Sequence, residues 1–507
     1  MRSKDWLLFL GILLIGVIIH EVGSIKKPFW LDYGLGRYSG NSIKYTEKKD
    51  YAVKETVYIE IMDNIGSVSV IGATRGGLEL AWDKLLYETD RKNADKIAQQ
   101  IKLNVEKTED IVKISTNVTQ VEEQYGVAIK NAFTLRVPPG SSISIKNKMG
   151  EVIVTNIKGK VSVKNSYGDT NLHNIHGETS IRQVFGNVQL HSITGRLSLE
   201  SEYSNIKADF LKGSSFFDLK YTKVQMENIE ADAEINMEYG FLKGASFTHQ
   251  LDITARHVGI ELRDIKGKVF LESDFSNIKI QDGQRDIAIE ARHSPLFLEN
   301  IQGKVYVEAN QKEVKLQNIS GWCKIIANHA VVEARQIHSG IYVKNAFEDI
   351  VLEDISGKAL IENHHSDIKI KMNYFNNSRY QVNTSYGNVE LILPEQNNFS
   401  MEGISYRGDI KNNYSDSYLF MKREGDYYKV RAKNNNENNN SISIKSYYGD
   451  IVINKRSKTV AWMIMKATTF KEDFQDKVSR SEAYIRDELL SRAIEFIYYA
   501  GQKYFRD

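Results

Sequence analysis

The sequence predicts an all-β protein whose body is a parallel β-solenoid, or β-helix, with 18-residue coils. Three observations predict this fold. Glycine or another small residue marks every ninth position in most of the stretch from Gly150 to Ser366, and no insertion or deletion breaks the phase. Within most blocks of nine, apolar residues at the second and fourth positions alternate with polar residues, which is the pattern of a strand with one buried face. Consecutive blocks differ, so each coil consists of two nine-residue half-coils.

The two half-coils differ in what they carry near the corner. The first carries isoleucine or another apolar residue at its seventh position, as at Ile157 and Ile175, and the second carries an aromatic or imidazole side chain at its eighth, as at Tyr203 and Tyr221. Strands this short cannot bury a face alone, so identical residue types at a fixed period predict stacked coils in which each column becomes a ladder. The ninth position is expected to be a tight corner, with little room for a side chain or with a positive φ.

Residues 1–25 predict a signal or anchor segment. Arg2 and Lys4 precede an unbroken apolar run over residues 6–19, which is shorter than the roughly 20 residues of a membrane span and matches the core of a signal peptide. Continuation through residues 20–22 gives a marginal span. The favoured interpretation is an exported or membrane-anchored, extracytoplasmic protein that keeps this segment as its anchor. A cleaved signal peptide and a buried helix of a soluble protein are the alternatives.

Before the regular repeat, residues 50–149 predict a β-rich cap that closes the open edge of the first coil. The alternation of residues 55–82 is less regular than that of the coils, residues 93–103 predict one short helix, and residues 110–116 predict another strand.

The regular solenoid is expected over residues 150–366. Residues 367–455 break the phase and predict an irregular continuation of the solenoid with an asparagine-rich loop at 433–441. Residues 459–506 carry apolar residues at steps of three, four or seven, which predicts an amphipathic helical extension. This extension either packs on the last coils as a cap, or docks a partner or a membrane.

Charge and cysteine content exclude several classes of protein. The chain has 67 basic and 65 acidic residues, whereas a general nucleic-acid binder carries a basic excess. Cys323 is the single cysteine of the chain, so an internal disulfide framework and a multi-cysteine metal site are excluded. It occupies the second position of its block and is expected to point inward as a small hydrophobic residue.

The order of elements resembles that of a known family. A strand pair containing NIGSVSVIG, a short helix, a strand that ends at Val137 and Pro138, and coils of the type GEVIVTNIKGKVSVKNSYGD follow one another over roughly residues 55–455. This order resembles the bacterial putative-adhesin β-solenoid family, a domain of unknown function common in cell-envelope proteins. The resemblance implies an exported or membrane-tethered β-solenoid and implies no catalytic residues. The chain departs from the family in its many non-glycine corners and in its C-terminal extension.

The sequence predicts no catalytic, cofactor-binding or metal-binding residue. His257, His293, His329 and His365 occupy one column at a spacing of 36 residues. Side chains two coils apart are separated by about 9.6 Å, whereas zinc ligands lie about 2 Å from the ion. Stacked corner residues are therefore the favoured interpretation of this column.

Outward acidic residues raise the alternative of a polysaccharide-active β-helix enzyme. Asp232, Glu272, Glu290 and Glu308 are interleaved with lysines such as Lys304, which favours a solvated face with charge pairing between coils. The sequence gives no reason to single out a pair of carboxylates at hydrolytic spacing.

A contact strip is predicted on the outward side of the second half-coil. Its residues are Phe270, Tyr306, Trp322, Tyr342 and Leu360, joined by Ile326. The strip either binds a protein or a glycan, or it is covered by residues 367–455 or by the C-terminal extension, since a long uncovered apolar strip favours aggregation.

Together these features predict a non-enzymatic, envelope-associated β-solenoid scaffold or adhesin-like binding protein that presents a rigid rod for partner contact. The alternatives are the polysaccharide-active enzyme and a self-assembling structural element joined through coil ends or through the C-terminal helix. The expected partners are a protein or a glycan, and a membrane through the N-terminal segment. No nucleic acid and no cofactor are expected.

Overall fold

The structure is a computed structural model that describes residues 41–456, except 74–75, 396–398, 416–417 and 433–438. The chain divides into two compact units between Ala330 and Val331. Strands dominate both units, and the described residues contain two helices, α3 (Arg91–Gln100) and α4 (Val118–Tyr125).

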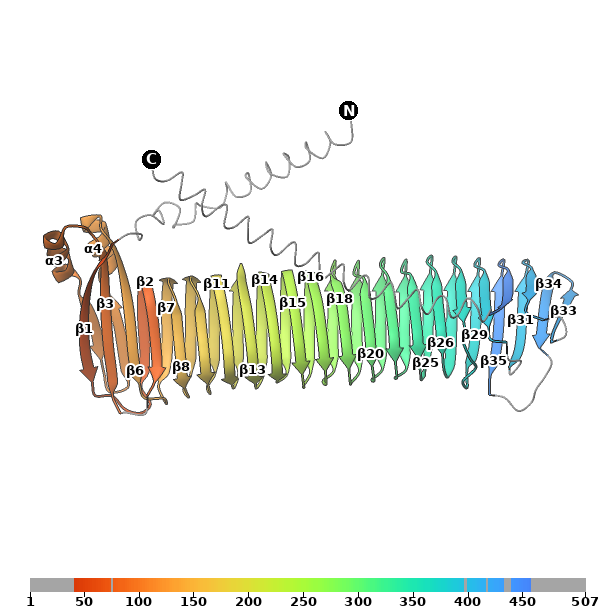
Figure 1. The fold of residues 1–507 in the computed structure, drawn as a ribbon, viewed down its shortest axis with the longest axis horizontal. Helices are drawn as coiled ribbons and strands as arrows, with labels where there is room; N and C mark the ends of the chain where they lie inside the picture. The colour runs from red at the N-terminus through yellow and green to blue at the C-terminus, as the bar shows by residue number, and fades with distance from the viewer. Residues whose placement is uncertain (1–40, 74–75, 396–398, 416–417, 433–438, 457–507) are drawn as a thin grey trace, which may run out of the picture. The chain divides into compact units, whose positions relative to one another are not determined.

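The strands of the first unit form its coils and close its N-terminal end (Figure 1). They are β1 (Ile43–Tyr51), β2 (Tyr58–Gly72), β3 (Leu78–Tyr87), β4 (Leu103–Lys107), β5 (Ile111–Thr116), β6 (Ala128–Val137), β7 (Ser142–Met149), β8 (Val152–Ile157), β9 (Val161–Tyr167), β10 (Thr170–Ile175), β11 (Thr179–Thr194), β12 (Leu197–Glu202), β13 (Ser204–Lys212), β14 (Ser215–Glu230), β15 (Ala233–Phe247), β16 (Leu251–Ile265), β17 (Val269–Asp274), β18 (Asn277–Gly283), β19 (Ile287–Arg292), β20 (Leu296–Ile301), β21 (Val305–Asn310), β22 (Val314–Ile319) and β23 (Cys323–Asn328).

The strands of the second unit form shorter pieces of the same kind. They are β24 (Val332–Ile337), β25 (Gly340–Ala346), β26 (Ile350–Ile355), β27 (Lys358–His364), β28 (Ile368–Lys371), β29 (Arg379–Ser385), β30 (Val389–Leu393), β31 (Ser400–Tyr406), β32 (Ile410–Asn413), β33 (Leu419–Glu424), β34 (Tyr427–Ala432), β35 (Ser441–Tyr447) and β36 (Ile451–Lys455).

Consecutive coils of the first unit pair in parallel, one 18-residue repeat apart. On one side of the coils, Val152 of β8 lies opposite Thr170 of β10, which in turn lies opposite Val188 of β11. On the other side, Ile143 of β7 lies opposite Val161 of β9. The predicted parallel β-solenoid with 18-residue coils is therefore confirmed.

The interior of the first unit is filled by the apolar positions that the alternation predicts. The residues of the seventh-position column are almost completely buried: Ile157, Ile175, Ile193, Leu211, Ile229, Phe247, Ile265, Ile301 and Ile319. Within the first unit, members of successive coils lie opposite each other, as Ile175 does with Ile193, and Gly283 takes the place of isoleucine between Ile265 and Ile301. The predicted internal ladder is therefore confirmed.

Single residues with a positive φ turn the chain near both corners. At the sixth position of the first half-coil these are residues such as Asn156 (φ 59°) and Asn174 (φ 56°), and at the eighth position of the second half-coil they are residues such as Tyr203 (φ 54°) and Tyr221 (φ 51°). Because one residue makes the bend, pairing continues around the corner, and β14 spans both half-coils as one strand of 16 residues.

Glycine is required at the ninth position for both of the expected reasons. Gly168 has a φ of 143°. Gly177 and Gly267 instead lie against the preceding coil, and a Cβ atom there would be 2.1 Å from the carbonyl oxygen of Gly159 and 1.6 Å from that of His249, respectively. Most glycines at the ninth position thus have both a positive φ and a close approach to the backbone of the preceding coil.

The N-terminal end of the first unit is closed by antiparallel strands. β2 forms the first coil, because it pairs in parallel with β7 and β8 on one side and with β5 and β6 on the other. β4 then pairs antiparallel with β5, β3 with β6, and β1 with β3. The exposed residues Lys48, Lys49 and Asp50 on β1 disfavour pairing with another chain.

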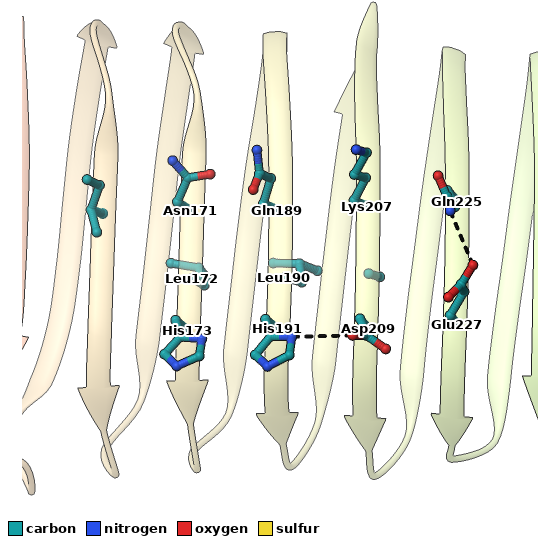
Figure 2. A pocket seen from close by; sticks show the side chains of 12 residues that line it. Asn171, Leu172, His173, Gln189, Leu190, His191, Lys207, Asp209, Gln225 and Glu227 are labelled. Carbon is teal, nitrogen blue, oxygen red and sulfur yellow. Dashed lines mark hydrogen bonds and ion pairs between the residues drawn. The ribbon is translucent and has the colours of Figure 1, made fainter.

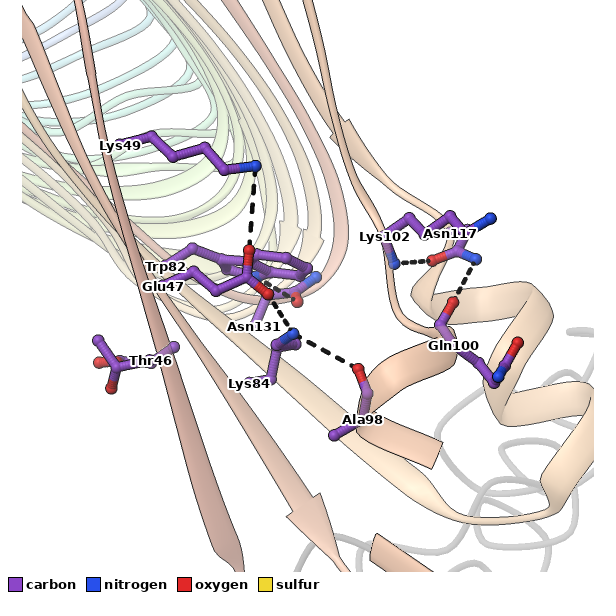
Figure 3. Close-up of polar contacts among 11 residues, drawn as sticks. Thr46, Glu47, Lys49, Trp82, Lys84, Ala98, Gln100, Lys102, Asn117 and Asn131 are labelled. Carbon is purple, nitrogen blue, oxygen red and sulfur yellow. Dashed lines mark hydrogen bonds and ion pairs between the residues drawn. The ribbon is translucent and has the colours of Figure 1, made fainter. Parts of the chain in front are cut away.

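A buried polar network joins β1, β3 and β6 (Figure 3). Lys84 of β3 is buried, and its Nζ atom lies 2.5 Å from Oε1 of Glu47 on β1 and 4.6 Å from the centre of the Trp82 ring. Nε1 of Trp82 donates a hydrogen bond of 2.9 Å to Oδ1 of Asn131 on β6. The cap is thus held by paired charges and hydrogen bonds as well as by its apolar interior.

The predicted helix at 93–103 is α3, which begins two residues earlier and ends at Gln100, because the C-cap residue Ile101 has an extended backbone. α4 was not predicted. It is short, and Gly126 ends it in the left-handed region with its N–H donating to the carbonyl of Glu122.

In the second unit the last coil in the sequence is not the last coil in space. β35 lies between β29 and β31, because Ser441 is opposite Arg379 on one side and opposite Ser400 on the other. β36 lies in the same way between β30 and β32. The antiparallel strands β34 and β33 then follow β31. The sequence predicted a continuation of the solenoid here and gave no sign of this inserted coil.

The terminal segments fall outside the described residues. The signal or anchor segment predicted at 1–25 and the helical extension predicted at 459–506 both lie there. Within the part of the chain that is described, no helix has the length and apolar character that crossing a membrane requires.

Candidate binding surfaces

An aromatic ladder runs along one corner of the first unit, as the eighth-position column predicted. Its rings, in order, are Tyr167, Phe185, Tyr203, Tyr221, Tyr239, His257, Phe275 and His293. Neighbouring ring centroids lie 4.3–5.2 Å apart, and neighbouring ring planes differ by at most 13°. The ladder is exposed, since Tyr221 retains 50% of its accessible surface.

Stacking explains how aromatic residues occupy positive φ. The left-handed region costs a residue with a side chain about 1–2 kcal/mol, and each aromatic pair contributes about 0.5–1.5 kcal/mol. An inner ring has two stacked neighbours, so the two terms are of similar size. Both faces of an inner ring are covered, so the ladder offers ring edges and hydroxyl groups to a ligand and leaves no inner face on which a sugar ring can stack.

A surface hollow, here called the first trough, lies on the outward side of the first half-coils. It runs across β10, β11, β13 and β14 (Figure 2). It has a volume of about 370 Å³. One row of its side chains is Asn171, Gln189, Lys207 and Gln225, and the other is His173, His191, Asp209 and Glu227. Leu172, Leu190 and Ala208 lie between the rows and belong to the buried face.

Contacts between coils hold the rows of the first trough in place. The rings of His173 and His191 stack with centroids 4.9 Å apart. Nδ1 of His191 lies 3.4 Å from Oδ2 of Asp209, and Oδ1 of Asp209 accepts a hydrogen bond of 2.9 Å from Asn228. The trough thus presents amide, imidazole, ammonium and carboxylate groups in fixed order along the coils.

The second trough lies beside the aromatic ladder and has a volume of about 580 Å³. Its polar lining residues are Asp218, Lys220, Asn236, Glu238, Thr254, Arg256, Glu272, Ser273, Asp274 and Arg292. Two of its carboxylates have cationic or imidazole neighbours: Arg292 Nη2 lies 3.2 Å from Glu272 Oε1, and Nδ1 of His293 lies 3.1 Å from Oδ1 of Asp274. Acidic and basic groups therefore alternate in this trough.

Both troughs were missed at the level of the sequence. Their signal was present at outward positions of the blocks, the third and fifth in the first trough and the fifth and seventh in the second, but these positions vary from coil to coil. Only the register of the strands brings together side chains that are 18 or 36 residues apart.

In the first unit the predicted contact strip is interrupted. Phe270 is 45% exposed, and Ala288 lies opposite both Phe270 and Tyr306 in the sheet. Lys324 Nζ lies 5.1 Å from the centre of the Tyr306 ring. The hydroxyl of Tyr306 hydrogen-bonds Glu308, and this bond raises the pKa of Tyr306 to about 12. Trp322 and Ile326, the other members in this unit, are half-buried.

In the second unit Tyr342 lies opposite Leu360, and both are half-buried. Burial, together with a hydrogen bond of 3.2 Å from its hydroxyl to Glu362, raises the pKa of Tyr342. Phe270, Tyr306 and Tyr342 thus each have a polar or small neighbour. The role of the strip as a contact surface stays a prediction.

The other candidate residues of the sequence are the histidine column and Cys323. The histidines lie at corners of the coils, and Cys323 lies in the interior. His257 and His293 are separated by Phe275 in the ladder. In the described residues, no group of three or more His, Cys, Asp or Glu side chains is arranged to hold a metal ion. Cys323 is buried as predicted, and burial raises the pKa of its thiol to about 12.

The second unit carries its own stacked rings. The ring of His365 stacks on Phe347 and on Tyr386, and Tyr386 stacks on Tyr448, with centroids 4.8–5.4 Å apart. Arg407 lies 5.3 Å from the centre of the Tyr448 ring. The eighth-position column therefore forms a ladder in this unit as well.

Comparison with known proteins finds a family model that is similar to part of the chain. Residues 304–454 match the family described as Toastrack DUF4097, which confirms the resemblance to a β-solenoid family of unknown function. No curated protein matches. A solved structure described as a putative cell adhesion protein from Clostridium sporogenes is 8% identical, with a TM-score of 0.13, over 82% of this chain and 100% of that chain.

Proposed function

We propose that this protein is a non-enzymatic, extracytoplasmic binding scaffold, tethered through residues 1–25, whose coils hold an extended glycan chain of the cell envelope. The Toastrack match over residues 304–454 supports a scaffold or adhesin-like role. The apolar segment at the N-terminus supports export.

One observation carries this proposal. In the first trough, polar side chains of the same half-coil position lie side by side on consecutive strands, with strand neighbours about 4.8 Å apart. A surface with that regular spacing suits a partner that is itself extended and repetitive. The geometry of the coils, and no single residue, then sets the spacing of the contacts.

The chemistry of the two troughs favours a glycan over other extended polymers. Amide and imidazole groups both donate and accept hydrogen bonds, as sugar hydroxyls do. The basic groups Lys207 and Arg256 are accompanied by Asp209 and Glu238 in the same troughs, whereas a polyanion such as nucleic acid is bound by a basic excess. Charge balance in the whole chain agrees with this choice.

The experiment is co-sedimentation of the full-length chain with insoluble peptidoglycan, a glycan polymer of bacterial envelopes. Removing polar groups from the first trough in the variant Gln189→Ala/Asp209→Ala is expected to weaken binding about tenfold or more, because a hydrogen bond to a charged group contributes about 1.5–3 kcal/mol. Gln189 is exposed and Asp209 is half-buried on the outer side of the strand, so the thermal midpoint is expected to stay close to that of the unmodified chain.

A matched control is Gln302→Ala/Asp286→Ala. Gln302 and Asp286 are exposed and lie outside both troughs. Asp286 accepts one hydrogen bond, as Asp209 does from Asn228. Equal binding by both double variants contradicts the assignment to the first trough. Shortening of the glycan during incubation contradicts the non-enzymatic assignment and favours the polysaccharide-active alternative, for which the carboxylates of the second trough are the first residues to test.

A further inference from the structure

A column of buried polar side chains lines the inner side of one corner in the first coils. Its members are Asp63, Asn147, Asn165, Gln183 and Ser201, and each is less than 9% exposed. Asp63 of β2 lies directly opposite Asn147 of β7, which lies opposite Asn165 of β9. A column of this kind is unexpected in an apolar core, because each buried polar group needs a hydrogen-bond partner.

The amide members of the column act as donors to the preceding corner. Nδ2 of Asn147 donates to the carbonyl oxygen of Gly66 at 3.2 Å, and Nδ2 of Asn165 donates to that of Gly150 at 3.1 Å. Asp63 holds the same position in the first coil. An ionised carboxyl group accepts hydrogen bonds only, whereas a protonated one also donates one. The first coil therefore has the donor of the column only when Asp63 is protonated.

One of the two carboxyl oxygen atoms of Asp63 has no hydrogen-bond partner among the described residues. The Oδ1 atom accepts hydrogen bonds from Asn131 Nδ2 at 2.7 Å and from the backbone N–H of Asn64 at 3.0 Å. Among the described residues, Asp63 Oδ2 has no hydrogen-bond partner, and neither has Oδ1 of the opposite residue, Asn147. Two buried acceptors on adjacent strands, at residues that lie opposite each other, thus have no donor.

We propose that Asp63 is a proton-operated latch on the first coil, whose protonated carboxyl group donates from Oδ2 to Oδ1 of Asn147 and loses this bond on ionisation. The latch joins β2 to β7, where the N-terminal cap meets the regular coils. It is a property of the cap and does not depend on the proposed glycan binding.

The charged groups near Asp63 do not supply a salt bridge. A hollow of about 420 Å³ beside it is lined by Lys146 and Lys148 of β7 and by Lys164 of β9. Lys146 pairs with Glu60 at 2.8 Å. β5 and α4 contribute only uncharged residues to the lining of the hollow: Ser115, Thr116, Val118 and Thr119. Asn131 of β6, which donates to Asp63, is also uncharged.

Burial raises the pKa of Asp63 to about 6, against the hydrogen bonds from Asn131 and the backbone, which lower it. An unfolded Asp has a pKa of about 3.9. Since the folded value is the higher one, the stabilisation is fully present below about pH 3.9 and is lost as the pH rises through about 6. Between pH 5 and pH 7.5 these two values predict a loss of about tenfold in the equilibrium constant for closing this corner.

The test is amide hydrogen exchange of β2 and β7 in the full-length chain, compared with the variant Asp63→Asn at pH 5 and pH 7.5. Asparagine keeps the shape and supplies a permanent donor to Asn147. The ratio of protection factors, variant over unmodified chain, is expected to be about tenfold larger at pH 7.5 than at pH 5. A ratio that does not change with pH overturns the proposal.

Asp50→Asn is the matched control, because Asp50 lies in the same cap and is exposed; its ratio is expected to be the same at both pH values. A direct measurement covers failure of the Asp63 variant to fold. Infrared spectra of the unmodified chain labelled with carbon-13 in its Asp carboxyl groups are expected to show a protonated carboxyl that disappears with a midpoint near pH 6. Complete ionisation of all Asp carboxyl groups at pH 5 also overturns the proposal.

Discussion

Replacement of Gly267 by alanine is expected to destabilise the coils around it by more than about 3 kcal/mol, which is more than most single substitutions cost. The added Cβ would lie 1.6 Å from the carbonyl oxygen of His249 in the preceding coil. No flexible side chain can move aside, because the clash is with backbone. The coils must separate, and this opens hydrogen bonds such as that from Lys266 N–H to the carbonyl of Phe247 at 2.7 Å.

Hydrogen exchange of β16 and β17 measures this effect locally, since a long repeat array does not unfold in one step. The control is Gly76→Ala, because a Cβ atom at Gly76 meets no described atom within 4 Å. The expected result is a large loss of protection in the Gly267 variant alone. Equal protection in the two variants contradicts the role assigned to close packing between coils.

Replacement of Phe247 by alanine is expected to cost about 3–5 kcal/mol, as for a fully buried aromatic residue. Phe247 interrupts the isoleucine column between Ile229 and Ile265. It fits because of Gly244, where a Cβ atom would lie 2.6 Å from Cε2 of the Phe247 ring. The large and the small residue therefore compensate for each other within one coil.

This compensation gives a second measurement with an internal control. Gly244→Leu alone is expected to be strongly destabilising, because the new side chain and the Phe247 ring claim the same space. Adding Phe247→Ile restores the residue types of the neighbouring coils and is expected to recover most of the loss. A coupling below about 0.5 kcal/mol in the double-mutant cycle contradicts this packing account.

The sequence predicts the regular coils well, because their determinants are local and repeated. Ile157 and Ile175 recur with their period, and a buried ladder follows from that period and strand geometry alone. The corner glycines were also interpretable, since a required small residue implies close approach or a positive φ, and Gly267 and Gly168 show one case each.

Other features depend on contacts that no local pattern records. The position of β35 between β29 and β31 is decided by pairing between segments far apart in the chain. The positive φ of Tyr221 contradicts the usual preference of aromatic residues and depends on stacked neighbours 18 residues away. Asp63 lies in a stretch that the sequence assigned to the cap, and only the register with Asn147 makes it a member of the buried column.

The binding surfaces follow the same distinction. The sequence singled out aromatic residues such as Tyr306 and Tyr342, whose types attract attention. The troughs are made of ordinary residues such as Gln189 and Asp209, which become a surface only when the strands place them in rows. The sequence therefore predicts the scaffold, while the candidate site requires the register of the coils.

The measurement that tests the central claim most directly is the affinity of the full-length chain for soluble peptidoglycan fragments of increasing length, determined by calorimetry. A partner held by successive coils gains contacts as it lengthens. The account predicts that affinity rises with fragment length until the fragment spans the first trough and then levels off, and that the rise is absent in Gln189→Ala/Asp209→Ala. Affinity that does not depend on length, or no binding at any length, would contradict it.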